Sequence, residues 1–135
     1  HAWILMSNHL HMIVSARGNS VSDILRDFKK FTSKAIIKAI EENRGESRRE
    51  WMLAIFKKAG EENVRNSKYQ FWRQDNQPKE CYSRDFILQK LEYIHNNPVE
   101  AGIVEKAEEY LYSSARDYHG AAKGLLELDI LTFNN

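Results

Sequence analysis

The chain has 135 residues, of which 42% are hydrophobic and 29% are charged, and its formal net charge is +1. This composition predicts one folded domain over residues 1–135 with an apolar core, and it excludes a disordered segment. The near-neutral charge excludes a globally basic surface, so any nucleic-acid contact must come from local clusters. Cys81 is the only cysteine, and neither a signal peptide nor an apolar run of roughly 20 residues is present, which together predict a cytoplasmic protein without a membrane partner.

The first two apolar segments predict β-structure. Residues 2–6 (AWILM) and 9–15 (HLHMIVS) are separated by Ser7 and Asn8, which favour a turn. They indicate either a hairpin or a single strand with a bulge. Because side chains alternate along a strand, the second segment places one apolar set toward the core, consisting of Leu10, Met12 and Val14.

The same alternation puts His9 and His11 on the opposite face of that strand, about 7 Å apart along it. Neutral imidazole is a common ligand of divalent metals, so this pair can form half of a metal site. The alternative is two solvent-facing histidines on an edge strand, because a His-x-His pattern alone is weakly specific.

Three longer segments predict helices. Apolar residues recur at nearly helical spacing from Ser20 or Ser22 to about Glu42, and a second helix covers roughly 48–59. Between them and the third helix, residues 63–68 indicate a loop, 69–72 (YQFW) are strand-like and 73–78 form a polar turn. The third helix begins after Ser83 and is expected to stop at Pro98. The remaining segments are a connector at 99–104, a short helix or extended piece at 108–118, and an uncertain tail at 124–131.

The third helix carries a second candidate pair. At about 100° per residue, Tyr93 and Asn97 lie on one face, beside a core stripe made of Ile87, Leu91 and Ile94. A phenol with a pKa near 10 becomes a nucleophile when its anion is stabilised, and a nearby metal can polarise a phosphate under attack. The alternative is a half-buried aromatic residue followed by an ordinary Asn-Pro helix ending.

Four segments together carry a family resemblance. MSNHLHMIV (6–14) resembles the M-P-N-H-V-H-L segment of the single-tyrosine HUH transposases, with Ser7 where proline is usual. YIHNNPVEAGIV (93–104) resembles the Y-I-x-x-N-P-V-x-A-G-L-V segment of their REP-associated branch. YLYSSARDY (110–118) resembles W-x-Y-S-S-x-x-x-Y, with Tyr110 in place of tryptophan. FWRQDNQP (71–78) lies where that branch has a W-Q-x-G-like turn, so the resemblance extends from residue 2 to about 120.

The resemblance implies a fold and a set of roles. The family fold is α+β, an antiparallel sheet with helices packed on it in a ferredoxin- or RNA-recognition-like arrangement. By resemblance, His9, His11 and Asn97 would bind Mg²⁺ or Mn²⁺, and Tyr93 would be the nucleophile that forms a 5′-phosphotyrosine link. The family carries a strand and a helix before its histidine motif, so we expect natural residues upstream of His1.

Local positive charge provides candidate DNA contacts. Lys30, Lys34 and Lys38 repeat every four residues and form a stripe on the first helix. Arg73 and Arg116 are further candidates near the other two motifs. The alternative for the stripe is an ordinary solvated helix face.

These observations lead to one expected function and two rivals. We expect metal-dependent cleavage and transfer of single-stranded or hairpin DNA, with the 3′-oxygen as leaving group. The rivals are a metal-dependent nuclease that activates water and a catalytically inactive, domesticated DNA-binding module. The resemblance leaves both a homodimer and a single active subunit open, and a missing first strand would expose a sheet edge that could pair with a second copy.

Overall fold

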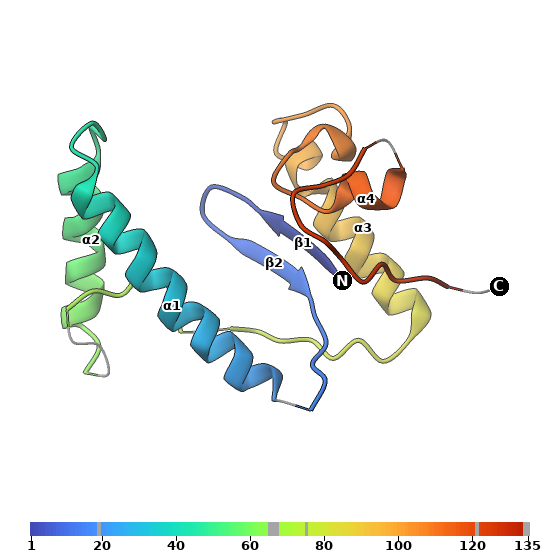
Figure 1. The fold of residues 1–135 in the computed structure, drawn as a ribbon, viewed down its shortest axis with the longest axis horizontal. Helices are drawn as coiled ribbons and strands as arrows, with labels where there is room; N and C mark the ends of the chain where they lie inside the picture. The colour runs from blue at the N-terminus through green and yellow to red at the C-terminus, as the bar shows by residue number, and fades with distance from the viewer. Residues whose placement is uncertain (19, 65–67, 75, 121, 134–135) are drawn as a thin grey trace. The chain divides into compact units, whose positions relative to one another are not determined.

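The computed structural model describes residues 1–18, 20–64, 68–74, 76–120 and 122–133 (Figure 1). It is an α+β structure that divides into two compact units. The first unit contains residues 1–17 and 79–135, and the second contains residues 18–78. The assignment of the whole chain to a single domain stays a prediction.

The first unit begins with a β-hairpin. Strand β1 (Ala2–Leu5) pairs with strand β2 (Leu10–Ile13) in antiparallel register. The backbone N–H of Met6 donates to the carbonyl of His9 at 2.9 Å and closes the loop between the strands. Of the two alternatives left open by the sequence, the hairpin is therefore the observed one.

The hairpin face that carries the histidines is also the core face, which corrects the prediction. Ala2 lies opposite Ile13 and Ile4 lies opposite His11, so all four share one face. Ala2, Ile4 and Ile13 are buried, whereas Val14, which was expected in the core, is 46% exposed. Strand periodicity shows which residues share a face, but the packing partner decides which face is covered. Here that partner is the third helix, which contacts both strands.

Helix α3 (Arg84–Glu100) begins where the sequence predicts, because the Ser83 hydroxyl accepts a backbone N–H of the first turn at 3.3 Å. It does not stop at Pro98 as expected, but continues through it to residue 100. Pro98 is fully buried and its carbonyl accepts the N–H of Ile103 at 2.9 Å. Proline lacks the N–H that would bond the Ile94 carbonyl, but its fixed φ suits a helix and its burial helps offset this loss. Asn97 therefore has a helical backbone.

For residues 108–118 the sequence predicted either a short helix or an extended piece, and the segment after α3 contains both. A short helix, η1 (Ala107–Glu109), is followed by an extended stretch and then by α4 (Ala115–His119). The extended stretch runs along the free edge of β1: Ile4 bridges Ser113, and Leu5 N–H donates to the Tyr112 carbonyl at 2.9 Å. The edge that a missing strand was expected to expose is thus partly occupied by the chain itself.

A buried polar network joins this stretch to α3. Trp3 N–H donates to the Ser114 hydroxyl at 3.0 Å, and Ser114 N–H donates to the Trp3 carbonyl at 2.9 Å. His95, which is only 4% exposed, places Nε2 2.9 Å from the same hydroxyl. Burial, together with repulsion from His119 and against the opposing effect of Asp117, lowers the pKa of His95 to about 4. His95 is therefore a neutral structural residue.

The second unit contains the other two predicted helices. Helix α1 (Val21–Glu42) and helix α2 (Arg49–Glu61) confirm the segments predicted at 20–42 and 48–59. The two helices contact each other. Part of the loop predicted at 63–68, namely 65–67, and position 75 of the predicted turn lie outside the described residues.

The strand-like prediction for residues 69–72 is wrong, because these residues form no strand. Their aromatic side chains pack instead. The Phe71 ring lies 5.1 Å from that of Phe56, and the Trp72 ring lies 6.0 Å from that of Phe28. Trp72 Nε1–H also donates to the Thr32 hydroxyl at 2.8 Å. The aromatic content reflects packing onto helices rather than sheet pairing.

No helix within the described parts of the chain combines the length and apolarity that crossing a membrane would require.

The neutral state of His95 makes folding sensitive to acid. An unfolded imidazole titrates near 6.5, whereas the buried one titrates at about 4. Between these values the unfolded state binds a proton that the folded state excludes. The free energy of unfolding should therefore be steady above pH 6.5 and fall as the pH drops from 6.5 toward 4, with a His95 contribution of at most about 3 kcal/mol.

Urea denaturation at a series of pH values measures this effect. His95→Gln should be less stable at pH 7 but should show a shallower fall below pH 6.5, whereas His119→Gln, on an exposed residue, should keep most of the parent's slope. Equal slopes in the parent and in His95→Gln would contradict the assignment.

Candidate functional site

The packing of α3 on the hairpin brings together four residues singled out in the sequence. His9 lies in the loop immediately before β2, and His11 lies within β2. Tyr93 and Asn97 are one turn apart on α3. The rings of His9 and His11 are 4.8 Å apart between centroids, and those of His11 and Tyr93 are 5.5 Å apart. His9 Nε2 lies 3.2 Å from Asn97 Oδ1.

Two acceptor oxygens flank the imidazole of His9. Asn8 Oδ1 lies 2.6 Å from Nδ1, and Asn97 Oδ1 lies 3.2 Å from Nε2. The amide nitrogen of Asn97 is directed the other way, toward the Tyr93 carbonyl at 3.5 Å. A neutral imidazole has one N–H and can donate to only one of two oxygens. If Nδ1–H donates to Asn8, the Nε2 lone pair faces the Asn97 oxygen, and either a proton on Nε2 or a cation shared with Asn97 would relieve this arrangement.

The spacing of these two atoms suits a shared cation. Two ligands in octahedral positions about 2.1 Å from one ion lie about 3 Å apart, close to the 3.2 Å found between His9 and Asn97. His11 supplies a second imidazole beside the first. A set of two imidazoles and one amide oxygen suits a divalent transition ion such as Mn²⁺ better than Mg²⁺, which prefers oxygen ligands. The described residues contain no cluster of three or more His, Cys, Asp or Glu side chains, so Asn97 would have to complete the set.

The electrostatics of His11 favour ligand binding. Burial lowers the pKa of His11, and the neighbouring His9 lowers it further. The imidazole of His11 is consequently neutral at pH 7. Its lone pair is available for a cation without the loss of a proton.

Tyr93 presents its phenol to solvent at the edge of this group. It is 49% exposed, and within the described part of the chain its hydroxyl forms no hydrogen bond. Lys90, one turn earlier on α3, places its ammonium 5.9 Å from the centre of the Tyr93 ring. The phenol is therefore accessible to an incoming ligand and has one cation near its ring.

The candidate DNA-contacting cations lie in both units. Lys30, Lys34 and Lys38 are exposed along α1 of the second unit, and Lys38 forms an ion pair with Glu42 at 3.7 Å. Arg73 belongs to the same unit, where its carbonyl accepts a bond from Lys29. Arg116 lies in the first unit, and its Nε–H donates to the Glu108 carbonyl at 2.9 Å. Arg116 thus has a structural role in joining α4 to η1.

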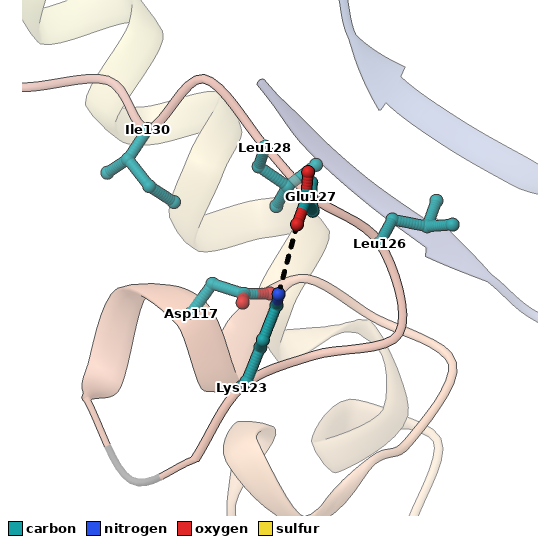
Figure 2. A pocket seen from close by; sticks show the side chains of 6 residues that line it. All are labelled: Asp117, Lys123, Leu126, Glu127, Leu128 and Ile130. Carbon is teal, nitrogen blue, oxygen red and sulfur yellow. Dashed lines mark hydrogen bonds and ion pairs between the residues drawn. The ribbon is translucent and has the colours of Figure 1, made fainter.

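A pocket in the first unit lies away from these predicted residues. It is formed by Asp117 of α4 and by the segment that follows α4, and Figure 2 shows the Lys123–Glu127 ion pair, 3.2 Å long, across it. The Gly124 N–H donates to Asp117 Oδ1 at 2.9 Å. None of its lining residues was predicted to be functional, and the pocket contains no member of the histidine, tyrosine and asparagine group.

Two residues of the site were missed or underestimated in the sequence. Asn8 was interpreted only as a turn former, yet its side chain orients the imidazole of His9. Lys90 received no role, although its position three residues before Tyr93 places both on one helical face. The helical spacing was the available signal for Lys90, whereas nothing local revealed the role of Asn8.

Comparison of the chain with protein-family models, with curated proteins and with solved structures gave no match. Inferences about function therefore rest on the site residues and on the motifs in the sequence.

Replacing the Tyr93 hydroxyl should leave the fold intact. Because the hydroxyl has no protein partner among the described residues, Tyr93→Phe should change the free energy of unfolding by less than about 0.5 kcal/mol. Denaturant unfolding monitored by circular dichroism measures this change. A loss of several kcal/mol would show that the hydroxyl supports the fold rather than remaining free for a ligand.

Proposed function

We propose that the chain cleaves and transfers single-stranded DNA with Tyr93 as nucleophile, in the manner of the REP-associated single-tyrosine HUH transposases that its motifs resemble. The observation that carries the proposal is the convergence of four motif residues from segments more than 80 positions apart. His11 and Tyr93 have rings 5.5 Å apart, and His9 and Asn97 approach to 3.2 Å. The coarse α+β fold, with α3 packed on an antiparallel hairpin, is compatible with the HUH palm that the proposal requires.

Cleavage in this proposal is a transesterification. The phenolic oxygen of Tyr93 attacks the phosphorus of a backbone phosphate, and the bond from phosphorus to the 3′-oxygen breaks. The phenolic proton is released and the departing 3′-oxygen takes up a proton, so the products are a 3′-hydroxyl end and a 5′-phosphotyrosine. Attack by a second strand's 3′-hydroxyl reverses these changes and restores Tyr93. The phosphoester bond is conserved throughout, so ATP is not required.

The chain's own residues contribute position and charge. Helix α3 holds Tyr93 one turn from Asn97, so the phenol stays beside the polar group formed with the hairpin. Asn8 orients His9 through a 2.6 Å contact, and the lowered pKa of His11 keeps that imidazole neutral. His9, His11 and Asn97 would hold Mn²⁺ or Mg²⁺, which when bound would polarise the phosphate and stabilise the charge that develops on it.

Covalent capture of DNA tests this proposal. The full chain is incubated with single-stranded hairpin DNA and Mn²⁺, and the products are separated on a denaturing gel. We expect a protein–DNA adduct that is absent with Tyr93→Phe, because phenylalanine offers no nucleophile, and that is retained with Tyr112→Phe, another exposed tyrosine of the same unit.

Two outcomes of the capture experiment would contradict the proposal. Cutting without an adduct, at a rate unchanged in Tyr93→Phe, would indicate a nuclease that activates water. Binding of the hairpin without any cutting would indicate a catalytically inactive DNA-binding module.

Metal binding gives a test that does not depend on activity. His9→Ala and Asn97→Ala should each weaken Mn²⁺ binding by roughly 100-fold or more, because each removes a proposed ligand. The His119→Ala variant, which alters a histidine outside the group, should bind like the parent. Affinity should fall as the solution is acidified, since protons compete with the metal for imidazole nitrogens.

Electron paramagnetic resonance of free Mn²⁺ during titration measures the affinity directly. Equal affinities in the parent, His9→Ala and Asn97→Ala would rule out this metal site.

A further inference from the structure

A row of side chains on α3 and the residues just before it leads to Tyr93. We call Tyr82, Phe86 and Lys90 the aromatic–lysine row. The rings of Tyr82 and Phe86 are stacked, with centroids 5.3 Å apart and planes inclined by 14°. The Lys90 ammonium lies 5.0 Å from the Phe86 ring centre and 5.9 Å from the Tyr93 ring centre. The three residues of the row and Tyr93 belong to the first unit.

The row lies beside the core stripe of α3, with Phe86 and Lys90 partly exposed and Tyr82 exposed. The core side of α3 is formed by Ile94, which is 3% exposed, with Leu91 packed beside it. Tyr82, in contrast, is 80% exposed although it is a large aromatic residue. Its stacking on Phe86 therefore leaves a broad ring surface open to solvent. Phe86 lies about two helical turns, roughly 10 Å, from Tyr93, and Tyr82 stacks on Phe86, so a strand that contacts the Tyr82 ring can extend along α3 to the proposed nucleophile.

The chemistry of the row fits a single strand of nucleic acid. An open aromatic ring can stack on an unpaired base, and a nearby ammonium can neutralise a backbone phosphate. Asp85 and Glu92 lie about 100° around the helix from Phe86 and Tyr93, so Lys90 is the charged residue between the rings. A duplex is a poorer fit, because its base faces are already stacked and closed to a protein ring.

We propose that the aromatic–lysine row binds the DNA strand next to the phosphate that Tyr93 attacks, with a base stacked on Tyr82 and a phosphate paired with Lys90. This inference rests on the proposed function for its location, and it deepens that function by identifying the residues that present the strand. It assigns Tyr82 a contact with bases and Lys90 a contact with the backbone.

Binding to two matched strands separates these contacts. The full chain without metal is titrated with a fluorescent oligothymidylate of about 12 nucleotides and with an abasic strand of equal length. Tyr82→Ala should weaken binding to oligothymidylate roughly 10-fold and leave binding to the abasic strand unchanged, because only the former has bases to stack. Tyr82→Phe, which keeps the ring, should bind both like the parent.

Lys90→Gln should act differently. It should weaken binding to both strands, and it should reduce the slope of log K against log salt concentration by about 0.7, the value for one phosphate contact on a single strand. Tyr112→Ala and Lys123→Gln are the matched controls, since they alter an exposed tyrosine and a lysine outside the row. Both controls should bind like the parent.

Failure of this inference is distinguishable from failure of the proposed function. Equal binding of oligothymidylate by the parent and Tyr82→Ala, or an equal loss on both strands, overturns the stacking role. An unchanged salt slope in Lys90→Gln overturns the phosphate role, and a parent that binds neither strand overturns both. If the variants show the predicted binding pattern but the capture experiment gives no covalent adduct, the row is supported and the strand-transfer reaction is rejected.

Discussion

The packing of the hairpin's core face against α3 is the constraint on which the rest of the first unit depends. The buried side chains of Ile4, Ile13 and Ile94 hold this contact together. His11 shares the face of Ile4 and Ile13 because the alternation of a strand allows no other choice. The apolar residues that stabilise the contact therefore also direct the histidine toward the helix that carries Tyr93. Stability and the proposed chemistry depend on the same register.

The hydrogen-bonding capacity of His9 links this packing to the proposed metal site. Its two nitrogens each face an amide oxygen, one from Asn8 and one from Asn97. Because the single N–H of a neutral imidazole cannot satisfy both, a proton on the second nitrogen or a cation shared with Asn97 would complete the arrangement. The buried network around His95 lies round the helix from this site and contributes to the fold instead. His9 and His11 belong to the candidate site, whereas His95 belongs to the buried network, so their surroundings distinguish the three histidines.

Tyr93 combines features that suit a nucleophile accessible to a large substrate. It is held by a regular helix, it remains half exposed, and the Lys90 ammonium lies 5.9 Å from the centre of its ring. A flexible DNA strand needs an open approach of this kind, because its backbone must reach the phenol while its bases are accommodated nearby. The enclosed pocket typical of enzymes for small molecules is not required for such a reaction.

The sequence by itself determined the helix segments, the shared face of His9 and His11 and the one-turn relation of Tyr93 to Asn97, because these depend on local periodicity. It misjudged the end of α3, since the burial of Pro98 stabilises a helix that local rules would stop. It also placed Val14 rather than Ile13 in the core. Only the tertiary structure decided these points and brought the two pairs together, because the choice of covered face depends on a helix 80 residues away.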